Sequence, residues 1–471
     1  MWEIFKFGSN KLSVNIVHPV IAYTFIYVTY FTIGGLIRLG NLQPPTYLSL
    51  MIVYASLLSF IGGYYFARKY SITKNKIIIK IYNILNKKIS ILLRMLNLRN
   101  KLRFFLGILI ITSEIGIIIY MLTVGIPIIE NPSAEIRHKA NVLKLFFVLY
   151  SISMGFFIIH KIDNIRKMKL FLKQKDLILR HILLLIIIAQ AIIILSIPAY
   201  RTLILFFGGC IFLYFISGKR INILYIFLVS IIVFLMIAYF TYYRDVMTYG
   251  EEAVERFLRY RGLNPSWKYW IYGWLTMRGG ACVFSDLVDY INKYGFFSLL
   301  FGKFHGKFYE TVFITLFPGK QPGPRTLISA IRGTRLSSTT TPTILGGVFL
   351  DFGIVGTVSF SFLLGYILTK IYKFVSSIEG EKRSQYIYVY CLTLIVVLID
   401  IHSGLLDGPF ILSILLAWLF VVCTSYPQHK KEKYLATILI LVLFFIIILL
   451  AISFVDLVMG NYLDINDVTS F

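Results

Sequence analysis

Arginines beside apolar segments are the residues of this sequence best suited to chemistry, because a guanidinium group binds a phosphate through two parallel hydrogen bonds. Arg201 lies shortly after Pro198, at the turn between two apolar segments. An arginine this close to hydrocarbon is unfavourable unless it pairs with another group, has a function, or extends its side chain to the lipid headgroups. Arg137 follows a turn with glycine and proline and precedes two more basic residues, although an interfacial loop with incidental charges has the same composition. Both arginines are candidate ligands of a phosphate group.

The densest polar segment, 318–342, lies just before an apolar segment predicted to be a membrane span. Its basic side chains and hydroxyl groups would lie at the N-terminal end of that helix, where free backbone N–H groups and the helix dipole favour an anion. A pyrophosphate would suit this place, and a flexible polar linker is the alternative. Arg278 precedes Gly279 and Gly280, which would let the backbone approach a ligand beside a guanidinium group. The candidate pyrophosphate ligands are Arg201, Arg137, Arg278, Arg325 and Arg335.

Two side chains are candidates for a general base. His305 is the sole histidine of the hydrophilic segment 242–345, and a histidine titrates near neutral pH. A lone histidine in a loop is more often simply solvated. Asp351 lies inside a later apolar segment, where an ionisable group is a candidate functional residue. We therefore take His305 and Asp351 as the catalytic candidates. The same argument makes three further residues candidates for the base: Asp400, His402 and Asp407.

The composition indicates a membrane protein. Of the 471 residues, 58% are hydrophobic, which is more than the core of a soluble domain could hold. The chain has 47 Lys and Arg against 22 Asp and Glu, a net charge of +25. Most of this excess lies in short loops, where it sets topology, so nucleic acid is not an expected partner. The four cysteines have no paired spacing, which indicates buried thiols rather than disulfides or a metal site.

The fold class predicted from the apolar segments is all-α: a multi-spanning helical membrane protein with about 11 transmembrane helices and one large extracytoplasmic loop. The first apolar run is long enough to be a retained signal anchor. The segment 67–103 contains basic residues and no acid, which marks it as cytoplasmic. Alternation then places the N-terminus inside and the segment 242–345 outside. The predicted spans are 18–37, 47–66, 104–124, 143–160, 182–198, 201–216, 223–241, 346–372, 386–402, 409–424 and 434–456.

These spans divide the chain into an N-terminal membrane bundle of seven spans, a large loop with amphipathic helices, and a C-terminal bundle of four spans. The three regions are 1–241, 242–345 and 346–471. The loop holds 13 Lys and Arg against 7 Asp and Glu, which an external anionic ligand would explain, although long translocated segments escape the charge rule. Its pairs Glu252–Arg256 and Glu255–Arg259 have the spacing of a surface helix. The aromatic run 267–274 fits an interface belt better than a sugar-stacking surface.

Several of these features together resemble the oligosaccharide repeat-unit polymerase family, of the O-antigen polymerase type. The turn 125–128 followed by Arg137 resembles an outer-loop signature of that family. Arg201, before a short apolar run, is similar to its hairpin arginine. The large loop followed by the glycine-containing segments 345–347 and 351–356 resembles its late glycine-patterned helix. The number of spans and the long outer loop also fit the layout of the family.

The resemblance implies a glycosyltransferase that polymerises lipid-linked oligosaccharide repeat units. A growing glycan would pass from polyprenyl pyrophosphate to a sugar hydroxyl of a second lipid-linked unit, on the outer face of the plasma membrane. An arginine followed by a glycine eleven positions later, a pattern discussed for such polymerases, is found at Arg335 and Gly346. The arginines would bind the pyrophosphate, and His305 or Asp351 would deprotonate the acceptor. Bidentate guanidinium contacts that strengthen as charge develops can replace a metal, so no metal and no cofactor are expected.

The expected partners are polyprenyl-pyrophosphate-linked oligosaccharide and membrane lipid, with a chain-length regulator as a further candidate. Two alternatives use the same kind of substrate. An O-antigen-ligase-like transferase would use the same arginine chemistry with another acceptor, but the His- and Asn-rich loop motif of the ligases is missing. A flippase or exporter of lipid-linked oligosaccharide is expected to show repeated bundles and short outer loops, and the sequence shows neither.

Overall fold

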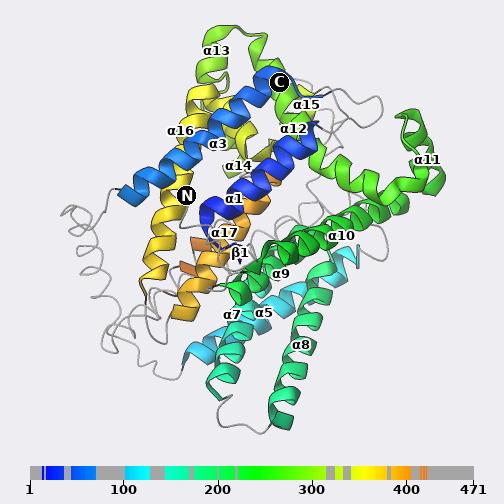
Figure 1. The fold of residues 1–471 in the computed structure, drawn as a ribbon. Helices are drawn as coiled ribbons and strands as arrows, with labels where there is room; N and C mark the ends of the chain where they lie inside the picture. The colour runs from blue at the N-terminus through cyan, green and yellow to red at the C-terminus, as the bar shows by residue number, and fades with distance from the viewer. Residues whose placement is uncertain are drawn as a thin grey trace.

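The computed structural model of the protein is a bundle of helices (Figure 1). Besides helices, the described part of the chain contains one two-residue antiparallel pair, β1 (Ser13–Val14) with β2 (Ile221–Asn222), in which Ser13 lies opposite Asn222. The structure describes residues 13–14, 17–36, 44–69, 101–127, 144–168, 174–198, 201–217, 221–314, 324–332, 341–378 and 383–404, and five positions between 414 and 421.

Seven helices in the described ranges are long and apolar enough to cross a membrane, so the chain is a multi-pass membrane protein. Two shorter apolar helices, Pro19–Ile33 and Thr202–Ile216, coincide with predicted spans. The predicted spans 409–424 and 434–456 lie mostly or wholly outside the described residues, so the total of eleven stays a prediction. The seven candidate spans are Tyr47–Lys69, Leu106–Val124, Leu145–Ile165, Gln174–Ser196, Ser230–Tyr249, Thr343–Ser376 and Arg383–Ser403.

Most helices follow the predicted segments, but α10 (Ile223–Tyr249) continues past the predicted end at 241. The reason is a small core in which Tyr242 of α10 packs with Val254 and Leu258 of the next helix. The preceding elements are α1 (Pro19–Tyr27), the π-helix η1 (Val28–Ile33), α2 (Gly34–Leu36), α3 (Tyr47–Lys69), α5 (Lys101–Val124), α7 (Lys144–Met168), α8 (Gln174–Ser196) and α9 (Arg201–Ile216). The following ones are α11 (Glu251–Tyr260), η5 (Pro265–Trp267), α12 (Lys268–Asn292), α13 (Phe296–Phe301), α14 (Lys307–Ile314), α15 (Pro324–Ile331), α16 (Thr343–Ser376) and α17 (Arg383–Ser403).

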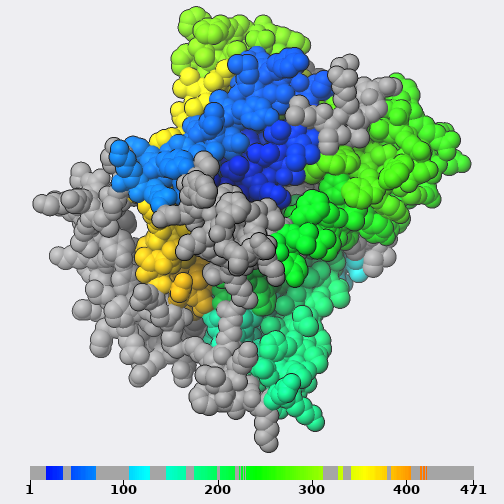
Figure 2. Space-filling view, viewed as in Figure 1, coloured from blue at the N-terminus to red at the C-terminus, as the bar shows by residue number. Residues whose placement is uncertain are grey.

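Two large hydrophobic cores organise the described helices. The first core, in what we call the α7 bundle, is built from α5, α7, α8, α9 and most of α17. The second, in the α16 bundle, is built from α1, η1, α3, α12, α13, α14, α15 and α16. The last turns of α17 join the second core through Val397 and Ile401. In Figure 2, α7 and α8 project at the bottom, away from the blue surface that α3 forms.

Helices α3 and α16 pack so closely that their backbones touch. A Cβ atom at Gly63 would overlap the carbonyl group of Phe362, and one at Gly365 would overlap that of Phe60. Small residues allow this approach between helices in membranes. At the C-terminal ends, the Lys373 ammonium group donates to the Arg68 carbonyl oxygen at 3.0 Å. The two helices therefore run parallel, and their basic ends lie together, on the side that the charge pattern predicts to be cytoplasmic.

The helices of the predicted loop pack against the membrane helices. In α11, the two predicted ion pairs are confirmed: Glu252–Arg256 at 3.8 Å and Glu255–Arg259 at 3.2 Å. Both pairs are well exposed, so they stabilise the helix little.

Helix α12, in the middle of the predicted loop, contacts the start of α3. The Thr46 N–H before α3 donates to the Ser285 hydroxyl of α12 at 2.9 Å. The start of α3 and the middle of α12 therefore lie side by side.

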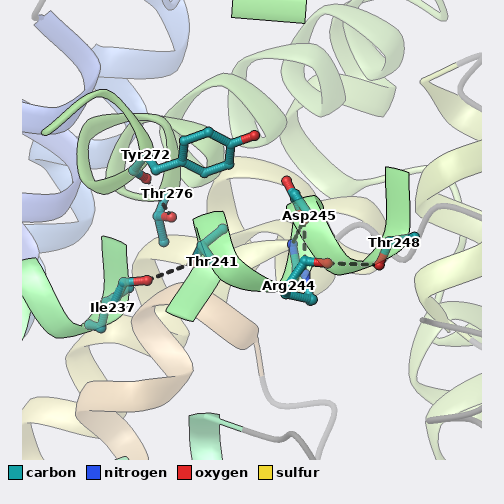
Figure 3. A network of polar contacts seen from close by, with 7 residues as sticks. All are labelled: Ile237, Thr241, Arg244, Asp245, Thr248, Tyr272 and Thr276. Carbon is teal, nitrogen blue, oxygen red and sulfur yellow. Dashed lines mark hydrogen bonds and ion pairs between the residues drawn. The ribbon is translucent and has the colours of Figure 1, made fainter. Parts of the chain in front are cut away.

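Polar residues mark the region where α10 and α12 meet (Figure 3). The Arg244 guanidinium group donates to the Asp245 carboxylate at 3.0 and 2.9 Å, within the last turns of α10. Tyr272 of α12 lies nearby, and burial raises the pKa of its hydroxyl, with the Asp245 charge raising it further. The hydroxyls of Thr241 and Thr248 donate to carbonyl oxygens of their own helix. These groups satisfy one another, so this network is structural.

Candidate active site

Arg278 lies on α12 and is the predicted phosphate ligand whose side chain the structure describes. Its exposed fraction is 2%, so a permanent positive charge is buried inside the α16 bundle. Cys282 and Asp286 follow at intervals of four residues and share its face of the helix. A buried cation is unfavourable unless other groups compensate its charge. This face of α12 therefore combines a buried guanidinium group with a thiol and a carboxyl group.

A second guanidinium group reaches the same face from α15. Arg332, directly after that helix, donates from Nε to the Asp286 carboxylate at 2.7 Å. Burial raises the pKa of the Cys282 thiol, while Arg278 and, less strongly, Arg332 lower it. Both arginines are therefore close enough to Cys282 to act on its charge. Sequence reasoning placed Arg332 in the dense polar segment but left it out of the candidate ligands, since its link to α12 has no local signal.

The predicted base His305 lies in the tight connection between α13 and α14. Its φ angle is 48°, in the left-handed region that few residues other than glycine adopt. Its side chain is exposed, while its backbone N–H donates to the Asp351 carbonyl oxygen at 3.2 Å. The structure thus brings together His305 and Asp351, which are far apart in sequence. Strained residues held firmly by their surroundings cluster at functional sites.

Asp351 lies in α16 and is wholly buried. One carboxylate oxygen accepts the Phe308 N–H at 3.0 Å, and the other accepts the Tyr309 N–H at 3.1 Å. These are free N–H groups at the start of α14, where a negative charge is favourable. Two residues later α16 kinks at Gly353, whose φ angle is 60°. Asp351 therefore fixes the start of α14 and, through its carbonyl group, the strained loop with His305.

The C-terminal end of α17 approaches the same region. Asp400 is buried, and its carboxylate accepts a hydrogen bond from the Ser403 hydroxyl at 3.0 Å. Burial raises the pKa of the Tyr309 hydroxyl on α14, and the charges of Asp351 and Asp400 raise it further. His402 forms a short hydrogen bond through Nδ1 with the Tyr30 hydroxyl of the π-helix η1. The competing base candidates Asp400 and His402 thus lie in the α16 bundle, whereas Asp407 lies outside the described residues.

The N-terminal end of α16, the predicted anion site, has an unusual first residue. Thr343 has a φ angle of 67° and is buried, and within the described structure its hydroxyl oxygen has no hydrogen-bond partner. Helix α12 reaches this turn, since a Cβ atom at Gly346 would lie 2.9 Å from the Leu287 side chain. The contact therefore places α12 beside the start of α16, through a face of the helix other than the one that contains Arg278 and Asp286.

The other predicted ligands are described only in part. Arg201 is the first residue of α9 and Arg325 the second of α15, but their side chains lie outside the described part. Arg137 and Arg335 lie wholly outside it. No statement about their contacts follows, and their role as phosphate ligands stays a prediction. Among the described residues, no group of three His, Cys, Asp or Glu side chains is arranged to hold a metal ion.

Comparison with known proteins identifies the class. A family model described as "Putative O-antigen polymerase" matches residues 13–414. This match covers most of the chain, and the chain belongs to this family, which confirms the resemblance seen in the sequence.

One similar protein is uncharacterized protein MJ0419 of Methanocaldococcus jannaschii, which is 32% identical over 121 residues. These residues are 25% of this chain and 32% of that protein, so the chain spans about a third of the length of this curated relative. No solved structure matches the chain.

Proposed function

We propose that the protein polymerises lipid-linked oligosaccharide repeat units on the outer face of the plasma membrane. It would transfer the growing glycan from polyprenyl pyrophosphate to a sugar hydroxyl of a second lipid-linked unit. The N-terminus would be cytoplasmic, and the helices α11 to α15 would lie in the extracytoplasmic loop. Family membership supports the general role. The observation that carries the mechanism is the convergence of Arg278 and Arg332 on one face of α12.

The arginines would stabilise the leaving group. When the acceptor oxygen bonds to the anomeric carbon, the bond from that carbon to the pyrophosphate oxygen breaks, and the departing pyrophosphate gains negative charge. Guanidinium contacts that strengthen as this charge develops lower the barrier without a metal. Arg332 is held in place by its hydrogen bond to Asp286, and Arg278 is buried on the same helix, so both guanidinium groups are positioned before substrate binds. Arg201, Arg137, Arg325 and Arg335 are the further proposed ligands.

The start of α16 would hold part of the same anion. The Thr343 hydroxyl and the free N–H groups of this first turn are suited to a phosphate oxygen. The neighbouring polar segment provides the proposed ligands Arg325 and Arg335. This location is supported by the contact of α12 with Gly346, which places the helix that bears Arg278 beside the start of α16.

His305 would be the general base. Its imidazole would take the proton of the acceptor hydroxyl as the new glycosidic bond forms. Its exposure leaves it accessible to a sugar, whereas both oxygens of Asp351 accept backbone N–H groups in a buried place. We therefore assign to Asp351 the positioning of the His305 loop, in place of the direct base role that the sequence also allowed.

The test is turnover of synthetic polyprenyl-pyrophosphate-linked repeat units by the purified full chain in EDTA, with products resolved on a gel. Wild type should form a ladder of lipid-linked oligomers. Arg278→Ala should lose it, because removal of one preorganised charge-stabilising donor lowers such rates by about 10²–10³-fold. Arg256→Ala is the matched control, since this exposed arginine of α11 lies in a weak surface pair.

Four outcomes would contradict the proposal. If wild type binds its substrate but forms no glycosidic bond, a flippase or exporter is favoured. Transfer to a different acceptor, without a ladder, favours a ligase-like transferase. A ladder that needs a divalent metal contradicts the metal-independent chemistry. A ladder that persists in folded Arg278→Ala excludes this arginine from the reaction.

A further inference from the structure

Helix α13 presents an aromatic surface that the rest of the described protein does not cover. Phe296, Phe297 and Phe301 are 67%, 77% and 51% exposed, and Leu299 is the buried residue of this six-residue helix. Tyr294, just before the helix, is also exposed. We call these four aromatic residues the α13 surface. Clustered exposed aromatic side chains mark a place where something other than water is contacted.

The position of α13 along α16 indicates its height in the membrane. A Cβ atom at Gly353 would overlap the backbone of Leu300, so α13 lies against the kink of α16. At 1.5 Å per residue, the segment from Gly353 to Lys373 is about 30 Å long, the thickness of the hydrocarbon. Lys373 marks the basic end that α16 shares with α3. The α13 surface therefore lies at the opposite boundary of the hydrocarbon.

The burial pattern of α16 gives the same boundary independently. Every residue from Thr343 to Asp351 is buried by protein. From Phe352 onward, apolar side chains of the helix are exposed, among them Val355 and Leu363. A Cβ atom at Gly302, directly after α13, would overlap the backbone at Asp351 and Phe352. The end of α13 therefore lies against the point of α16 where its apolar exposed side chains begin.

Cationic groups flank the aromatic residues. The Lys303 ammonium group lies 3.2 Å from the ring centre of Tyr294, and Lys293 is exposed on the other side of the helix sequence. The Tyr294 hydroxyl donates to that of Tyr290 at 3.2 Å. Aromatic rings with lysines at their edge are typical of the membrane interface, where rings enter the acyl boundary and ammonium groups contact lipid phosphates.

We propose that the α13 surface inserts into the outer leaflet of the bilayer that the chain spans, with Phe296 and Phe297 at the acyl boundary. Helix α13 then anchors the loop that follows it at the membrane surface. This loop contains His305 and is tied to α16 through Asp351. The proposal concerns a lipid contact, and it holds whatever reaction the protein performs.

The experiment places a photoreactive p-benzoylphenylalanine at Phe297 of the full chain, in vesicles of phosphatidylcholine with phosphatidylglycerol and a radiolabelled lipid. Light should couple labelled lipid to position 297. The yield should match that at Leu58, an exposed apolar residue of α3, and exceed several-fold that at Tyr260, the exposed end of α11. Phe296 provides a second position, since either side chain is too exposed for its replacement to unfold the protein.

Two results would overturn the proposal. One is lipid labelling at positions 296 and 297 no greater than at Tyr260, which would place the α13 surface in water. The other is coupling of position 297 to a second copy of the chain in place of lipid. The lipid-labelling result does not depend on whether the protein has polymerase activity. Failure of this proposal and failure of the proposed function can therefore be told apart.

Discussion

The interiors of the α7 bundle and the α16 bundle contain different kinds of buried polar group. In the described α7 bundle, the buried polar groups on α5 and α7 include serines whose hydroxyls donate within their own helix, such as Ser113 to Leu109 at 2.6 Å and Ser153 to Leu149 at 2.8 Å. The α16 bundle and the adjoining end of α17 contain the buried ionisable groups Arg278, Asp351 and Asp400. The buried charged side chains of the described structure therefore lie in the α16 bundle and the adjoining end of α17.

The backbones differ in the same way. The α16 bundle contains the π-helix η1, the kink at Gly353 and the positive φ angles of His305 and Thr343. Such irregularities and buried charges oppose stability, so they persist where function requires them. The α7 bundle consists of regular helices packed through aromatic and aliphatic side chains. The comparison favours the interior of the α7 bundle as a scaffold, and the proposed charge-stabilising groups Arg278 and Arg332 lie in the α16 bundle.

The largest effect is expected in the scaffold. Phe147→Ala removes a wholly buried ring that packs edge to face on Tyr120 at 5.2 Å. The cavity should lower the free energy of unfolding by about 3–5 kcal/mol. Thermal unfolding of the purified protein in detergent measures this loss, with lipid-facing Leu185→Ala as a nearly neutral control. Turnover per folded molecule should stay unchanged, and a selective loss of turnover would break the comparison.

In the α16 bundle, Arg332→Ala should lower polymerisation by about 10²-fold or more, since a charge-stabilising donor is lost. Arg332→Lys should restore little, because an ammonium group cannot form the bidentate contact. The matched control is Arg259→Ala, which breaks an equally simple ion pair, with Glu255, on the surface of α11. Initial rates at saturating substrate measure the effect. Equal rates for the two alanine variants would show that Arg332 is merely structural.

The roles of His305 and Asp351 can be separated by their pH profiles. His305→Gln should remove the rise in rate with increasing pH that a general base produces. Asp351→Asn should lower the rate about tenfold, as one N–H at the start of α14 loses its acceptor, yet the shape of the profile should remain. If instead Asp351→Asn abolishes the rise and His305→Gln keeps it, the two assignments must be exchanged.

The smallest effect concerns the surface junction of α11 and α12. Hydrogen bonds from Lys268 at 2.8 Å and from the Tyr242 hydroxyl hold the pKa of Glu251 below its usual value. A lowered pKa stabilises the folded junction above the ordinary carboxylate range, and this stabilisation is lost as the pH falls through the folded pKa. The protection factors of the α11 amides, which correct for the slower intrinsic exchange in acid, should therefore fall as the pH decreases. In Glu251→Gln this acid dependence should be absent, and its persistence would assign it to another group.

Local patterns in the sequence were sufficient for the helices and for the class of protein. Long apolar runs predicted the described spans, because a bilayer requires a minimum helix length. The spacing of Glu252 and Glu255 from their arginines predicted α11, because residues four apart are neighbours on a helix. The end of α10 was misplaced, since Tyr242 is held by a tertiary contact with α11. Hydropathy has no information about that contact.

The sequence by itself determined that this chain crosses a membrane many times and resembles the O-antigen polymerase family, because composition and short motifs contain that information. The tertiary structure alone decided that Arg332 reaches α12 beside Arg278, that Asp351 holds the loop of His305, and that α13 lies at the kink of α16. These contacts join residues from distant helices. They depend on how whole helices pack, and a linear pattern does not encode which of their faces meet.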